Sequence, residues 1–180
     1  MAFSAKAVAN YFLDVARRDG RSLDPMQVQK LVYFAHGWHL ALTGRPLIKE
    51  KVEAWPFGPV IRSLFHEFKR WGSGPIQELA TQPAKVGGLT FGSHPVSMDE
   101  EATNDDELAT AKRVLDRVWD VYGRFSGIKL SEITHHSDSP WFEVRRAHPG
   151  ERDVEIPNDS LQRFFSHRID RERDAAAHAG

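Results

Sequence analysis

Hydrophobic residues near the N-terminus recur with helical spacing. Between residues 4 and 19 the apolar positions form one stripe, made of Ala7, Val8, Tyr11, Phe12 and Val15. Ser4 is a suitable N-cap at one end, and Asp19-Gly20 provides a stop at the other. The pattern therefore predicts an amphipathic helix over these residues.

A second helix is predicted from Asp24-Pro25 to Gly44. Asp24 suits the N-cap, Pro25 suits the first helical position, and Gln27 completes a capping box. The expected inner face is Val28, Leu31, Val32, Ala35 and Leu42, while Phe34, Trp38 and Leu40 fall on other faces. Because apolar residues occupy several faces, we expect neighbouring elements to surround this helix and make it the centre of the fold.

The remaining pattern predicts further short elements. Residues 46–48 and 52–55 suit a small β-hairpin or extended pair, and residues 59–71 suit a helix with Ile61, Leu64, Phe65 and Phe68 turned inward. Glycine and proline punctuate residues 72–103, which predicts a long irregular insertion. Further helices are predicted over 105–122, around 128–134, from Ser139-Pro140, and around 161–169.

These elements predict a mainly α fold. We expect a single compact helical domain over residues 1–170 with a small β element, and an α+β arrangement is the alternative. Residues 171–180 are helix-prone but lack an apolar stripe, which favours a mobile tail.

Composition and charge narrow the function classes. The chain has 180 residues, with 24 Lys and Arg against 25 Asp and Glu, so no overall charge favours nucleic acid or an anionic membrane. The absence of cysteine excludes disulfides, thiolate metal sites and a cysteine nucleophile. No stretch has the length and apolarity of a membrane span. We expect a cytoplasmic protein with no membrane partner.

The segment Ala54–Val60 is a rigid corner that carries two large aromatic residues. Pro56 and Pro59 fix their own backbone and restrict the residue before each, while Gly58 permits a tight turn between them. Trp55 and Phe57 are therefore the best recognition candidates, because aromatic groups on a stiff loop lose little entropy on binding. The alternative is that both hold the corner against the second helix as ordinary core residues.

Three stretches in the same order resemble the Panacea domain, a prokaryotic antitoxin family. They are Met26–Ala35, the Ala54–Val60 corner, and Leu130–His135 followed by Pro140-Trp141. The resemblance covers roughly residues 5–166 and is greatest to the SocA-type antitoxins. It implies a protein that neutralises a cognate protein toxin by direct binding, without enzymatic activity or a cofactor. A SocA-type member would also act as an adaptor that delivers the toxin to the ClpXP protease.

The resemblance also implies a set of candidate partner-binding residues: Lys30, Tyr33, Trp55, Phe57, Gly58, Pro59, Thr134, His135 and Trp141. Lys30 can pair with a partner carboxylate or lay its stem on the core and reach solvent, and we prefer the second interpretation. Tyr33 can bond a partner or satisfy a buried acceptor, which is the more usual role. Thr134 and His135 are expected to end their helix, with Thr134 bonding a backbone carbonyl.

Three other functions are open to test. His36 and His39 share a helix face, and with His135 and His136 they permit a metal-dependent enzyme. A hydrolase built from Ser131 or Ser137 with His135 and Asp138 lacks a nucleophile elbow. Basic residues could serve a DNA-binding regulator, namely Arg62, Lys69, Arg70, Arg163, Arg168, Arg171 and Arg173. They are interleaved with acidic or apolar residues, so we expect a solvated face instead.

Overall fold

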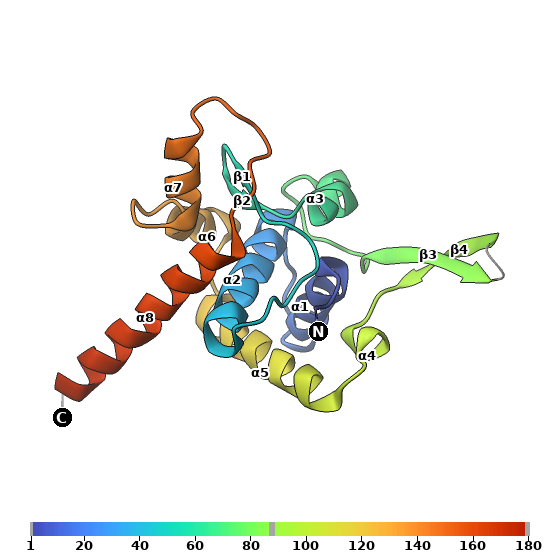
Figure 1. The fold of residues 1–180 in the computed structure, drawn as a ribbon. Coiled ribbons are helices and arrows are strands. Elements are labelled where there is room, and N and C mark those ends of the chain that lie inside the picture. Colours follow the sequence, from blue (N-terminus) through green and yellow to red (C-terminus); the bar gives the residue numbers. More distant parts are fainter. Residues whose placement is uncertain (1, 87–88, 179–180) are drawn as a thin grey trace.

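The structure, a computed structural model, describes residues 2–86 and 89–178. These residues form eight α-helices, one 3₁₀ helix and two antiparallel hairpins (Figure 1). The helices are α1 (Ala5–Arg18), α2 (Pro25–Thr43), α3 (Arg62–Phe68), α4 (Met98–Glu101), α5 (Asp105–Tyr122), α6 (Gly127–Thr134), α7 (Pro140–Ala147) and α8 (Asn158–His178). The 3₁₀ helix η1 spans Lys69–Trp71. The mainly α prediction with a minor β element is confirmed.

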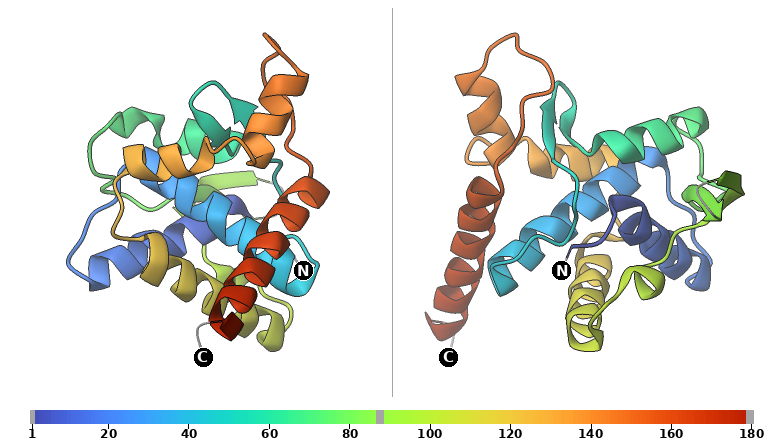
Figure 2. Two further views of the ribbon diagram at one scale, coloured as in Figure 1. Left: turned by 90° about the vertical axis from the view of Figure 1, so that its left-hand side faces the viewer. Right: turned by 45° about the vertical axis from the view of Figure 1, so that its right-hand side comes forward.

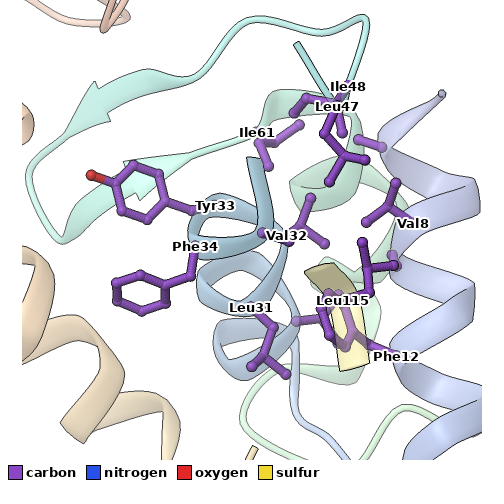
Figure 3. Close-up of a cluster of buried hydrophobic side chains, with 14 of the residues drawn as sticks. Val8, Phe12, Leu31, Val32, Tyr33, Phe34, Leu47, Ile48, Ile61 and Leu115 are labelled. Carbon is purple, nitrogen blue, oxygen red and sulfur yellow. The ribbon is translucent and has the colours of Figure 1, made fainter. Parts of the chain in front are cut away.

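The central position predicted for α2 is also confirmed. Helices α1, α5, α6 and α8 all pack against it, and Figure 2 shows α2 enclosed among them. Val8 and Phe12 of α1 lie on one side of α2, while Tyr33 and Phe34 point to the other (Figure 3). Leu42 does not join this core, because it lies in the last turn of α2 and is 58% exposed.

The ends of α2 follow the sequence signals. Asp24 and Gln27 form the capping box, with Gln27 N donating to Asp24 Oδ1 at 2.8 Å. Gly44 ends the helix in the left-handed region at φ 69°. About two turns before this end, α8 approaches α2 so closely that a Cβ on Gly37 would lie 2.1 Å from the Phe165 ring. Glycine at position 37 is therefore required for the packing of α8 on α2.

The β structure differs from the prediction in two places. Strand β1 (Glu53–Trp55) pairs with β2 (Gly58–Val60), so the rigid corner is itself the hairpin turn, and residues 46–48 are not the partner strand. Because residues 58–60 are extended, α3 begins only at Arg62 instead of Pro59. The outer edge of β1 is covered by residues 154–156, where Ala54 N donates to Val154 O at 2.8 Å.

The insertion at 72–103 is not irregular throughout. Strands β3 (Thr81–Val86) and β4 (Leu89–Pro95) form a hairpin that projects from the helical body, and the short helix α4 follows it (Figure 1). Gly87 and Gly88, which the sequence marked as a break, lie outside the described residues.

The C-terminal helix is longer than the sequence suggested. Helix α8 continues to His178 and so includes most of the predicted tail, while residues 179 and 180 lie outside the described part of the chain. None of the helices within the described ranges combines the length and the apolarity that crossing a membrane requires.

Candidate partner-binding site

The corner predicted from Pro56, Gly58 and Pro59 is the tight turn of the β1–β2 hairpin. Trp55 pairs with Gly58, which leaves Pro56 and Phe57 at the tip. Gly58 has φ +109°, a conformation that side-chain-bearing residues rarely adopt. The turn thereby points Phe57 outward, and 80% of its surface is exposed.

Lys30 holds this turn from below. Its Nζ donates to Pro59 O at 3.0 Å and to Phe57 O at 3.3 Å, and the side chain is only 2% exposed. Burial lowers the pKa of Lys30 to about 7, because an ammonium group is poorly solvated there. The prediction that this side chain reaches solvent is therefore wrong. Lys30 ends inside the protein because two corner carbonyls need a donor.

Helix α6 supports the same turn from a second side. Ser131 Oγ donates to Phe57 O at 3.1 Å, and Thr134 Oγ1 donates to Ser131 O at 2.7 Å. The expected bond from Thr134 to a backbone carbonyl is confirmed. A Cβ on Gly58 would lie 2.5 Å from Lys30 Nζ and 3.1 Å from Thr134 Oγ1, so only glycine fits between α2 and α6.

His135 and Trp141 close the cluster. The His135 and Trp141 rings stack with centroids 4.1 Å apart, and Trp141 Nε1 donates to Trp55 O at 2.7 Å. Burial, together with the nearby Lys30 charge, lowers the pKa of His135. Its Nε2 is buried and has no hydrogen-bond partner among the described residues. Helices α6 and α7 therefore fix the hairpin through both its strand and its turn.

Tyr33 lies apart from the other candidate residues. It is 1% exposed and packs edge-on against Phe34 and Phe165 in the core (Figure 3). The Tyr33 hydroxyl is buried without a hydrogen-bond partner in the described part of the chain, and burial raises its pKa. The expectation that it satisfies a buried acceptor is wrong, and its core position does not favour contact with a partner.

An apolar pocket of about 400 Å³ lies beside the exposed Phe57. Its walls come from α2, the β1–β2 hairpin, α3 and η1, and they are lined by Pro25, Met26, Gln29, Lys30, Trp55, Phe57, Val60, Phe65, Lys69 and Gly72. Trp55 packs on Phe65 at a centroid distance of 4.9 Å. Phe65 was expected to face the core, but 38% of it is exposed because it forms a wall of this pocket.

The sequence pattern did not indicate that Met26 and Phe65 belong to this surface. Met26 is 40% exposed at the first turn of α2, next to the capping box. The helical spacing of apolar residues in α2 does not single out Met26, because the β1–β2 hairpin as well as α2 forms the pocket wall. The one indication in the sequence was that Met26 is an apolar residue in the first turn of α2, beside the polar Asp24 and Gln27.

Comparison with known proteins identifies the family. The sequence profile of the family described as antitoxin SocA-like, Panacea domain, matches residues 28–142. The chain is also 34% identical over 137 residues to antitoxin SocA of Caulobacter vibrioides, covering 76% of this chain and 68% of that protein. The chain belongs to the SocA-like Panacea family. No solved structure matches it significantly.

The segment matched by the Panacea profile contains every candidate residue, from Lys30 to Trp141. It therefore includes the turn, its support by Lys30 and α6, and the Trp141 contact. Met26 lies just before the matched segment. The segment matched by the family profile thus contains the corner and the residues that hold it, whereas Pro25 and Met26 in the pocket wall lie before that segment.

The histidines have structural contacts in this Panacea-family chain. His36 Nε2 lies 2.8 Å from Asn158 Oδ1, and His36 Nδ1 accepts from Leu47 N and Ile48 N at 3.3 and 3.4 Å. Burial lowers the pKa of His36 to about 4, which keeps the ring neutral. Within the described ranges, no three His, Cys, Asp or Glu side chains form a group suited to a metal ion. The structure thus offers no support for a metal-dependent enzyme.

Two basic residues beside the site, Arg62 and Arg70, are neutralised by ion pairs, whereas Lys69 has no ion pair with a described residue. Arg62 pairs with Glu53 at 2.9 Å and with Asp153 at 3.0 Å, and Arg70 pairs with Glu78 at 2.6 Å. This arrangement does not favour the DNA-binding alternative, because phosphate binding needs cationic groups that remain available.

Proposed function

We propose that this protein is an antitoxin that neutralises its cognate protein toxin by direct binding through the corner surface. The corner surface consists of Met26, Trp55, Phe57 and Phe65, with the pocket between them. Membership of an antitoxin family supports the antitoxin role. The exposure of Phe57 on a rigidly held turn is the observation that carries the choice of surface.

The physical reason is the low entropic cost of binding at this place. A contiguous exposed apolar patch commonly marks an interface, and Phe57 is exposed beside the partly exposed Met26 and Phe65 around one pocket. Lys30, Ser131 and Trp141 already fix the hairpin backbone in the free protein. A toxin that buries Phe57 therefore orders little additional chain, and a preorganised aromatic anchor of this kind dominates interface energies.

The buried candidates act as support in this proposal. Lys30, Gly58, Pro59 and Thr134 position the turn from beneath, whereas Trp55 and Phe57 contact the toxin. His135 and Trp141 brace the hairpin against α7. The activity proposed here is stoichiometric binding, with no catalytic step and no cofactor.

The test is neutralisation in the native cells. The chain and its adjacent gene products are co-expressed under separate promoters, and growth and co-purification are measured for the native chain and for Phe57→Asp. We expect the native chain to restore growth and to capture a growth-inhibiting neighbour, and Phe57→Asp to do neither while remaining folded. If Phe57→Asp captured the neighbouring gene product with native affinity, the toxin would bind at a different surface.

A second step, delivery of the toxin to the ClpXP protease, is proposed on the basis of the SocA relationship. The last turns of α8 extend away from the helical body and from the β1–β2 hairpin (Figure 1), so a protease could reach them while the corner surface is occupied. We expect both proteins in the cytoplasm, where such a protease acts. Delivery predicts a shorter toxin lifetime when the antitoxin is present, whereas masking alone predicts an unchanged or longer one.

The role of the last turns of α8 is tested by truncation. Truncation after Arg173 should leave toxin binding intact and lengthen the toxin lifetime if the end of α8 serves only delivery. Loss of toxin binding on truncation would contradict that division of roles.

A further inference from the structure

The pocket beside Phe57 has a charge character that restricts what it can bind. Eight of its ten lining residues are uncharged, and the two charged ones are Lys30 and Lys69. Among the residues that the structure describes, no Asp or Glu lines it. The lining therefore combines a large apolar area with positive charge only.

The neighbouring acidic groups are already engaged. Asp24 Oδ1 accepts from Gln27 N in the α2 cap, and Glu53 accepts from Arg62 and from Trp55 Nε1 at 2.7 Å. Arg62 and Arg70 both form ion pairs, whereas Lys69 forms none with any described residue. Among the described residues, nothing therefore neutralises Lys69 at the rim of the pocket.

Lys30 contributes a buried amino group to the inner wall. An ammonium group has three N–H donors, and two of them are used by Phe57 O and Pro59 O. The titratable group facing Lys30 from the packed elements is His135 on α6, which is itself a base with a lowered pKa. Neither supplies a negative charge, so an incoming carboxylate would meet no repulsion here.

We propose that this pocket binds a short acidic segment of the partner protein, with one large apolar side chain in the pocket and an adjacent carboxylate on Lys69. The proposal rests on the proposed function and names the chemistry of the toxin segment. The pocket opens broadly to the surface beside the exposed Phe57 ring, which suits a segment of a protein partner better than a fully enclosed small molecule.

The experiment uses the full chain and two synthetic probes. Both are end-blocked hexapeptides with a Leu-Phe core, one flanked by aspartates and the other by lysines. Binding is followed by NMR of ¹³C-methyl-labelled methionine. The chain contains three methionines, of which Met26 lines the pocket, while Met98 is buried in α4 and serves as an internal control.

We expect the aspartate peptide to shift the Met26 methyl resonance and leave Met98 unchanged. The lysine peptide should bind more weakly by roughly threefold to tenfold, the scale of a rim charge contact. Lys69→Glu should reverse this preference. Lys112→Glu, which makes the same charge change on α5 where Lys112 pairs with Asp99, should retain it.

Several outcomes would overturn the inference. Equal affinity for the two peptides, an unmoved Met26 resonance up to millimolar peptide, or an unchanged preference in Lys69→Glu would each do so. Toxin capture that depends on Phe57 but not on Lys69 would leave the proposed function standing while this inference fails. Conversely, peptide binding as expected without any toxin capture would support the pocket chemistry and reject the proposed function.

Discussion

Two antiparallel hairpins in this chain expose aromatic residues, yet they differ in how they are held. In β1–β2, Phe57 is 80% exposed, and its turn is bonded by Lys30 and Ser131 while Trp141 bonds the strand. In β3–β4, Phe91 is 61% exposed, but the bonds to the helical body are made at the base, where Asn10 binds Ala80 and Val96. Similar local elements therefore present aromatic side chains with very different rigidity.

This difference decides which exposed aromatic is the better anchor. A two-stranded hairpin is only marginally stable by itself, so its tip is ordered only where other elements fix it. Binding through Phe91 would have to order the projecting β3–β4 arm, whereas binding through Phe57 uses a turn that is already fixed. The β1–β2 corner is therefore the better preorganised of the two surfaces.

The largest loss of stability is expected from Gly58→Ala, and Gly92→Ala makes the same change in the other hairpin for comparison. Gly58→Ala places a Cβ 2.5 Å from Lys30 Nζ at φ +109°, and should destabilise the protein by about 3 kcal/mol. Gly92→Ala in β4 also has positive φ, +72°, but no atom within 4 Å, and should cost about 1 kcal/mol. Urea unfolding of both variants measures the difference. Equal losses would show that the β1–β2 turn is no more tightly enclosed than the β3–β4 arm.

The next largest effect concerns the polar side chain that supports each hairpin. Lys30→Met removes the side-chain donor to Pro59 O, and Asn10→Ala removes the donor to Ala80 O and Val96 O, so each should cost about 1–3 kcal/mol. Their functional consequences should differ, because only Lys30 supports the corner. We expect Lys30→Met to weaken toxin binding and Asn10→Ala to preserve it. Similar binding by the two variants at a temperature where both are folded would contradict the role of Lys30.

A pH dependence should sharpen the same distinction. The pKa of Lys30 is about 7 in the folded protein and 10.5 as the ordinary value, so the unfolded chain binds more protons between these limits. The contribution of Lys30 to the free energy of unfolding is therefore greatest above pH 10.5. It decreases as the pH falls to about 7 and stays constant below that. The stability of the native chain relative to Lys30→Met should rise with pH in this window by at most about 1.4 kcal/mol per unit. A difference independent of pH would mean that Lys30 is solvated.

The smallest stability effect is expected from the exposed aromatics themselves. Phe57→Ala and Phe91→Ala remove side chains that are mostly in water, so each should change the unfolding free energy by less than about 0.5 kcal/mol. Thermal unfolding checks this expectation. A large loss in Phe57→Ala would show that its ring packs into the fold and is not available to a partner.

The sequence predicts the helices well where local chemistry marks their ends. Ser4, the Asp24 capping box and Ser139-Pro140 each begin a helix as expected, because a cap depends on residues within one turn. The partner of β1 was predicted wrongly, because the local pattern of residues 56–59 does not distinguish a corner that ends a strand from one that turns it back into a hairpin. The β3–β4 hairpin was missed because its residues lack a buried face, and so show no alternation.

The candidate site could be predicted only in part for a related reason. The resemblance to the Panacea family pointed to Lys30, the corner and Thr134-His135, but the contacts around the corner join segments 27 to 86 residues apart. The burial of Lys30 depends on two carbonyls from the corner, which no pattern within α2 reveals. The pocket walls formed by Met26 and Phe65 likewise arise only when α2, α3 and the hairpin pack together.

The most direct test compares the two aromatic anchors against the captured toxin. Isothermal titration calorimetry is run with the native chain, Phe57→Ala and Phe91→Ala, each confirmed as folded. We expect Phe57→Ala to weaken binding by more than about tenfold, the scale of an interface hot spot, and Phe91→Ala to bind as the native chain does. Native affinity in Phe57→Ala, or a comparable loss in Phe91→Ala, would contradict the assignment of the β1–β2 corner as the toxin-binding surface.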